Sequence, residues 1–193
     1  GYTNAGKSTL FNQLTHAGVY SADQLFATLD TTTRRVYLGD GIQISLADTV
    51  GFIRELPHQL VEAFKATLEE TVHADLLLHV IDAASESRDV QIAQVESVLE
   101  EIGAHEIPRI HVLNKIDLTG VPPRWRDLAE EGGATLGEVY LSAQTGAGLD
   151  LLRDALRSLA SAHQARVGEQ VGDASASQVG GAQATGISLG SAL

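Results

Sequence analysis

The sequence predicts a three-layer α/β fold, in which a mostly parallel sheet is covered by helices on both faces. Short apolar runs typical of strands alternate along the chain with segments whose apolar residues recur at helical spacing. A glycine-rich loop at residues 1–8 also leads directly into the first helical segment. These observations together favour strands joined by helical crossovers over an all-helical or all-strand architecture.

The individual elements follow from local patterns. Apolar residues at helical spacing predict helices at residues 7–16, 60–72, 92–102 and 149–159. Apolar runs predict strands at residues 34–38, 42–47, 76–81, 109–113 and 138–141. The turn Gly39-Asp40-Gly41 separates the first two strands and predicts one antiparallel hairpin. Predicted helices join strand 42–47 to strand 76–81, and strand 76–81 to strand 109–113, so the sheet is predicted to be mostly parallel.

The two ends of the chain differ from its middle. A glycine-rich loop of this kind normally leaves the end of a strand, so we expect the first strand of the fold to be missing and the chain to be a segment of a longer protein. Residues 165–193 are rich in small and polar residues and show no period. We expect one folded domain at residues 1–164, lacking its first strand, and a disordered tail at residues 165–193.

Composition limits the possible functions. The net charge is −12, from 25 acidic and 13 basic side chains, so direct nucleic-acid binding is not expected of this chain alone. No apolar run reaches the roughly 18 residues that a membrane span needs. Cysteine is absent, which excludes disulfides and thiolate metal sites and fits a cytoplasmic location.

Residues 1–8 match the phosphate-binding pattern G-x-x-x-x-G-K-[ST] at every fixed position, and we call them the phosphate loop. They are Gly1, Tyr2, Thr3, Asn4, Ala5, Gly6, Lys7 and Ser8. Glycines let the backbone turn its N–H groups toward phosphate oxygens. Lys7 is expected to reach the terminal phosphates of a nucleotide and the Ser8 hydroxyl to bind Mg²⁺. The sequence therefore predicts a P-loop NTPase fold.

Three further motifs follow predicted strands. The first is Asp48, Thr49, Val50 and Gly51, in which Asp48 is expected to hold Mg²⁺ and the Gly51 N–H to contact the γ-phosphate. The second is Asn114, Lys115, Ile116 and Asp117. The carboxylate of Asp117 can accept hydrogen bonds from guanine N1–H and its amino group, whereas adenine would leave it unpaired, so guanine is predicted. The third is Ser142, Ala143 and Gln144, where a backbone N–H can bind the guanine oxygen.

These motifs, in this order, are typical of the translation-factor-like class of P-loop GTPases, and the chain resembles the HflX family within it. The resemblance covers about residues 1–160 and is most specific at residues 26–64, including Phe26, Ala27, Thr28, Leu29 and Asp30. It implies a ribosome-associated GTPase that binds the large ribosomal subunit. It also implies that Thr28 is the switch threonine that binds Mg²⁺, although Thr31, Thr32 and Thr33 are rival assignments nearby. Lys7, Thr28 and Gly51 are the predicted catalytic residues.

Two positions bear on the mechanism. Many GTPases have a water-orienting Gln after the D-x-x-G motif, but this chain has Phe52, so slow intrinsic turnover stimulated by a partner is expected. Asn4 leaves two interpretations open, because it can either help bind K⁺ beside the phosphates or only stabilise the loop. A GTP-binding module that does not hydrolyse is the alternative function, and an ATPase is disfavoured by Asp117.

Overall fold

The structure is a computed structural model, and it describes residues 1–15, 32–48, 71–128, 133–172 and 187–190. It is an α/β fold with one mixed sheet, which confirms the predicted fold class. The helices are α1 (Lys7–Thr15), α3 (Arg88–Glu101), the 3₁₀ turn η1 (Ile116–Leu118) and α4 (Leu149–Gly172). The strands are β1 (Thr32–Gly39), β2 (Ile42–Asp48), β3 (Leu76–Asp82), β4 (Arg109–Asn114), β5 (Arg124–Asp127), β6 (Thr135–Tyr140) and β7 (Ile187–Gly190).

The sheet has the strand order β1-β2-β7-β3-β4-β6-β5. β1 and β2 form the predicted antiparallel hairpin. β3, β4 and β6 run parallel to one another, which fits the mostly parallel sheet that was predicted. β5 is antiparallel to β6 at the edge and was not predicted from the sequence. Its residues are polar apart from Trp125, which is normal for an edge strand but gives no apolar run to detect.

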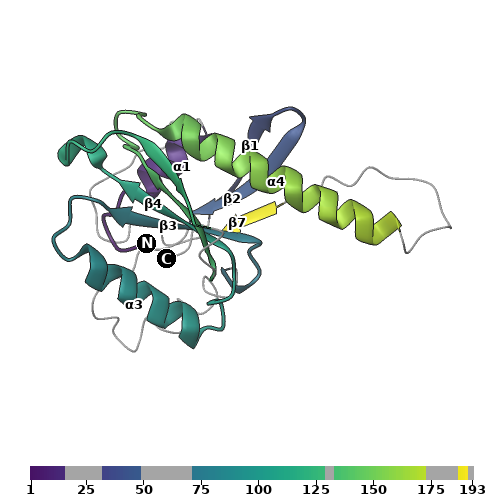
Figure 1. The fold of residues 1–193 in the computed structure, drawn as a ribbon, viewed down its shortest axis with the longest axis horizontal. Helices are drawn as coiled ribbons and strands as arrows, with labels where there is room; N and C mark the ends of the chain where they lie inside the picture. The colour runs from purple at the N-terminus through teal and green to yellow at the C-terminus, as the bar shows by residue number, and fades with distance from the viewer. Residues whose placement is uncertain (16–31, 49–70, 129–132, 173–186, 191–193) are drawn as a thin grey trace.

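Helices cover both faces of the sheet, as Figure 1 shows with α1 and α4 on one side and α3 on the other. Alternate residues of β3 point to opposite faces, so Leu76, Leu78 and Val80 join the larger core with α1 and α4. Leu77 lies on the other face and packs with Val95 and Leu99 of α3. The continuous apolar run of β3 is therefore explained by burial on both sides.

The C-terminal part of the chain differs from its prediction. α4 continues to Gly172, well beyond the predicted boundary at residue 164, because residues 160–172 contain no proline and several good helix formers. β7 then pairs in parallel with both β2 and β3. A strand from the C-terminal segment thus lies between β2 and β3 in the sheet. A disordered tail over all of residues 165–193 was the wrong expectation for these two segments.

Among the residues that the structure describes, no helix is long and apolar enough to cross a membrane. The predicted helix at residues 60–72 lies mostly outside the described residues, as do the switch segment at residues 26–30 and Phe52.

Candidate functional site

The phosphate loop lies at the carboxyl end of β3 and leads into α1. Ala5 N–H donates to the carbonyl of Tyr2 at 3.2 Å, which closes a tight turn. Gly6 has φ +92°, a backbone conformation that favours glycine. A Cβ on Gly6 would overlap the side-chain amide of Asn114, and one on Gly1 would overlap the carbonyl of Val80. Both glycines are therefore required by close packing of the loop.

Lys7 begins α1 and is buried, with only 8% of its surface exposed. Its Nζ donates to the carbonyl of Tyr2 at 3.1 Å. Burial lowers the pKa of Lys7 to about 8, and the nearby Asp48 carboxylate opposes this shift only in part. An additional negative charge beside Lys7 would stabilise its protonated form, which is what a nucleotide phosphate would supply.

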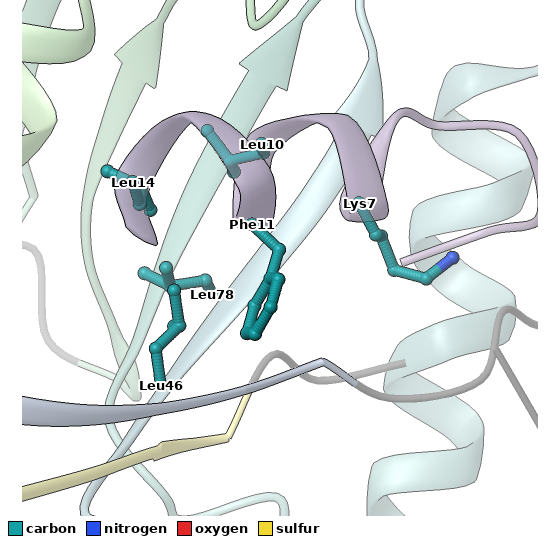
Figure 2. Close-up of a pocket in the computed structure, with 6 residues that line it drawn as sticks. All are labelled: Lys7, Leu10, Phe11, Leu14, Leu46 and Leu78. Atoms are coloured by element: carbon teal, nitrogen blue, oxygen red, sulfur yellow. The ribbon is translucent and has the colours of Figure 1, made fainter. Parts of the chain in front are cut away.

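A small apolar cavity lies between α1 and the sheet, and Figure 2 shows the side chains that line it. They are Lys7, Leu10, Phe11, Leu14, Leu46 and Leu78. The charged end of Lys7 extends away from the apolar side chains, toward the loop that precedes α1 (Figure 2). The cavity is therefore a minor packing defect of the core beneath α1 rather than the place where a polar ligand would bind.

Asn114 holds the three described motif loops together. Its side-chain amide donates to the carbonyl of Ala5 at 2.9 Å, in the phosphate loop. Its side-chain oxygen accepts from the N–H of Ala143 at 2.8 Å, in the motif that follows β6. All three residues are almost completely buried. One side chain at the end of β4 thus fixes the position of loops that are far apart in the sequence.

Lys115 and Asp82 form a second contact at this edge of the sheet. Lys115 has φ +67°, and its Nζ lies 2.7 Å from Oδ2 of Asp82 at the end of β3. Asp82 also accepts from the N–H of Ala84 at 3.0 Å through its other oxygen. Sequence reasoning did not assign Asp82 to the site. An acidic residue directly after a buried parallel strand was the signal that could have found it.

The residues predicted to bind a base lie next to Asn114. Asp117 lies in η1 and its side chain is exposed and accessible to a ligand. Ser142 and Ala143 are buried after β6, and Gln144 is exposed beside them. The loop is closed by Ser142, whose N–H donates to the Ala147 carbonyl at 2.9 Å. The structure therefore brings the second and third predicted motifs together at the carboxyl ends of β4 and β6.

Oxygen ligands suited to Mg²⁺ also occur here. Asp48 is buried at the end of β2. Its carboxylate is close enough to Lys7, in the phosphate loop, to offset in part the lowering of the pKa of that lysine by burial. Ser8 lies in the first turn of α1. A carboxylate and a hydroxyl are hard oxygen donors, so these residues fit the predicted ion.

Several predicted residues lie outside the described residues. They are Phe26, Ala27, Thr28, Leu29, Asp30, Thr31, Thr49, Val50 and Gly51. Two rivals for the switch threonine, Thr32 and Thr33, lie in β1, where they pair with Asp48 and Ala47 of β2. The backbone of both residues therefore takes part in the strand pairing of the hairpin.

Comparison with known families agrees with this geometry. Residues 1–115 match the family described as "50S ribosome-binding GTPase", and this match covers more than half of the chain. The chain belongs to this family. Its match extends from the phosphate loop to Lys115, so it includes Asp48, Asp82 and Asn114.

Curated relatives narrow the assignment within the 50S ribosome-binding GTPase family. GTPase HflX of Escherichia coli strain K12 is 61% identical over 157 residues, which are 81% of this chain and 36% of that protein. GTPase HflX of Caldanaerobacter subterraneus is 54% identical over 156 residues, 81% of this chain and 34% of that protein. The resemblance to HflX is confirmed. The chain spans about a third of the length of these relatives.

Solved structures show the same fold. A GTP-binding protein from Sulfolobus solfataricus in complex with GDP is 34% identical, with a TM-score of 0.63 over 83% of this chain and 50% of that one. Era in complex with MgGDPNP and a segment of 16S ribosomal RNA is 27% identical, with a TM-score of 0.59 over 81% of this chain and 53% of that one. The predicted P-loop fold is therefore confirmed.

Proposed function

We propose that this chain binds GTP with Mg²⁺ and hydrolyses it to GDP and phosphate, as a nucleotide-controlled switch that associates with the large ribosomal subunit. The observation that carries the nucleotide part is the position of Asn114, which joins the phosphate loop to the two base-binding motifs. The ribosomal part is supported by the family and by the HflX relatives. A cytoplasmic location follows from the same proposal.

The described residues would each contribute a separate interaction. Backbone N–H groups of the phosphate loop and the N-terminus of α1 would bind the phosphates, with Lys7 beside them. Asp117 would accept hydrogen bonds from guanine. Ser8, Asp48 and Thr28 would hold Mg²⁺, which would neutralise charge on the phosphates during hydrolysis.

Hydrolysis requires an oriented water, and Phe52 cannot donate or accept a hydrogen bond to one. We therefore expect slow turnover by the protein alone and faster turnover once a partner supplies the missing group. Equal rates with and without the partner would contradict this part of the proposal.

Asn4 is the residue through which K⁺ would act. It has φ +64° and is exposed at the surface of the phosphate loop, so its side chain is accessible. Hydrolysis by the natural full-length protein is expected to be faster in KCl than in NaCl, and Asn4→Ala should remove that difference. The same rate in both salts would leave Asn4 with a loop-stabilising role only.

The test of the main proposal is nucleotide binding and phosphate release by the natural full-length protein, with and without large ribosomal subunits. Selective binding of guanine nucleotides and stimulated release are expected. Asp117→Asn is the matched variant, because it keeps the size of the side chain and should lower GTP affinity by at least about 100-fold. Binding without any phosphate release would instead support the non-hydrolysing alternative.

A further inference from the structure

Two histidines and a glutamate converge on the face of the sheet that α3 covers. His79 of β3 and His111 of β4 are direct neighbours in the parallel register, so both side chains point to the same face. Their rings are perpendicular, with centroids 5.2 Å apart. Glu96 of α3 lies above them, and its Oε1 is 3.8 Å from Nε2 of His111. None of these residues belongs to the nucleotide site.

The polar atoms of this group are incompletely bonded. Nδ1 of His79 and Nε2 of His111 are both buried and have no hydrogen-bond partner. His79 is only 2% exposed. Buried polar atoms are nearly always satisfied, so two such nitrogens on neighbouring rings beside one carboxylate require a physical explanation.

We propose that His79, Glu96 and His111 form a metal site that takes Zn²⁺. One ligand atom from each residue lies within 4.8 Å of the others, the only group of its kind in the part of the chain that the structure describes. Imidazole nitrogen and carboxylate oxygen are common zinc ligands, and three protein ligands leave one position for water.

The geometry needs little adjustment. Zinc bonds of about 2.0–2.1 Å in a tetrahedron place ligand atoms roughly 3.4 Å apart. His111 and Glu96 are already close to that separation at 3.8 Å. Small side-chain rotations would bring a ring nitrogen of His79 within bonding distance of the same ion. Glu96 is on the surface helix with 37% of its side chain exposed, which gives an ion access from solvent.

The charges around the group set the expected affinity. Arg109 binds Oε2 of Glu96 and the carbonyl of His105, so only Oε1 of Glu96 faces the histidines. Burial also lowers the pKa of His79, which keeps its ring in the neutral form that binds metals. The positive charge of Arg109 opposes a second cation, and we expect a zinc Kd on the order of 1 µM.

The test uses the natural full-length protein, stripped of metal and saturated with Mg·GDP so that the nucleotide site is occupied. Zn²⁺ is titrated calorimetrically, and Co²⁺ is titrated while visible absorption reports tetrahedral coordination. One Zn²⁺ ion bound per protein molecule is expected. His111→Leu and Glu96→Gln should each weaken zinc binding by at least about tenfold. His105→Gln, at an exposed position, should have no effect.

Glu96→Gln is included because this half-exposed residue can change without emptying the core. Unchanged GDP affinity and thermal unfolding temperature without zinc would show that each variant is folded. Zinc binding no tighter than about 100 µM, or equal binding by the wild type and both variants, would overturn the proposal.

Discussion

Asn114→Ala is the substitution whose effect the structure predicts most directly. It removes the donor to the Ala5 carbonyl and the acceptor for the Ala143 N–H together. Ala5 and Ala143 are each 1% exposed, so water cannot easily replace the lost bonds. Leaving a buried polar group unpaired costs about 1–3 kcal/mol, so the two together predict a loss of about 2–6 kcal/mol.

Hydrogen exchange measures this loss at the site itself. The N–H of Ala143 should exchange faster in the variant, by at least roughly 30-fold if 2 kcal/mol of local stability is lost. Affinity for a fluorescent GDP analogue should fall in parallel, because the phosphate loop and the base-binding loop lose their common anchor. Both measurements can be made on the natural full-length protein.

Thr119→Ala is the matched control. The Thr119 hydroxyl donates to the Ile116 carbonyl at 3.0 Å and accepts from the Val121 N–H at 3.3 Å, so the same number of side-chain bonds to backbone is lost. Thr119 is exposed, and water can replace these bonds, so a change within about 0.5 kcal/mol is expected. If Asn114→Ala were as mild as this control, Asn114 would not be the anchor of the site.

Three other predictions concern α1, the phosphate loop and the core. Because the pKa of Lys7 is about 8 when folded and 10.5 ordinarily, the nucleotide-free protein should gain stability as pH rises from 8 toward 10.5. Binding of Mg·GDP should take up about 0.1 proton at pH 7 and about 0.9 at pH 9, measured by calorimetry in buffers of different ionisation enthalpy, and Lys7→Arg should abolish this uptake. Gly6→Ala should weaken GDP binding at least about tenfold, whereas Gly120→Ala, with φ +71° and open space around it, should only lose about 1 kcal/mol of stability. Leu156→Ala should lose about 2–5 kcal/mol in urea unfolding because Leu156 is 2% exposed, and equal loss from Leu118→Ala, at 69% exposure, would refute this reasoning.

Sequence reasoning succeeded where structure is determined locally. The hairpin, the three parallel strands β3, β4 and β6, and helices α1 and α3 follow from apolar spacing and turn residues. The phosphate loop, Asp48 and Asn114 could be singled out as candidate site residues because each directly follows or precedes a strand or helix with a clear apolar pattern. The carboxyl ends of parallel strands share one edge of a sheet, so the motifs could be expected to meet there.

Tertiary structure decided the features that depend on pairing between distant segments. No local signal marks the amide of Asn114 as the partner of Ala5, 109 residues away in the chain. The insertion of β7 between β2 and β3 depends on backbone groups, which every residue carries, rather than on a side-chain pattern. β5 was missed because a polar edge strand has only Trp125 to mark it.

The histidines illustrate the same limit. The sequence shows His79 and His111 on separate strands without any metal-ligand spacing between them, so no local pattern marks them as a pair. The register of β3 with β4 makes them neighbours, and the packing of α3 adds Glu96. The sequence determined which chemical groups are present and on which elements they lie, because hydrophobic periodicity is a local property. Only strand register and helix packing, which are set by burial of the whole core, determined which of those groups meet.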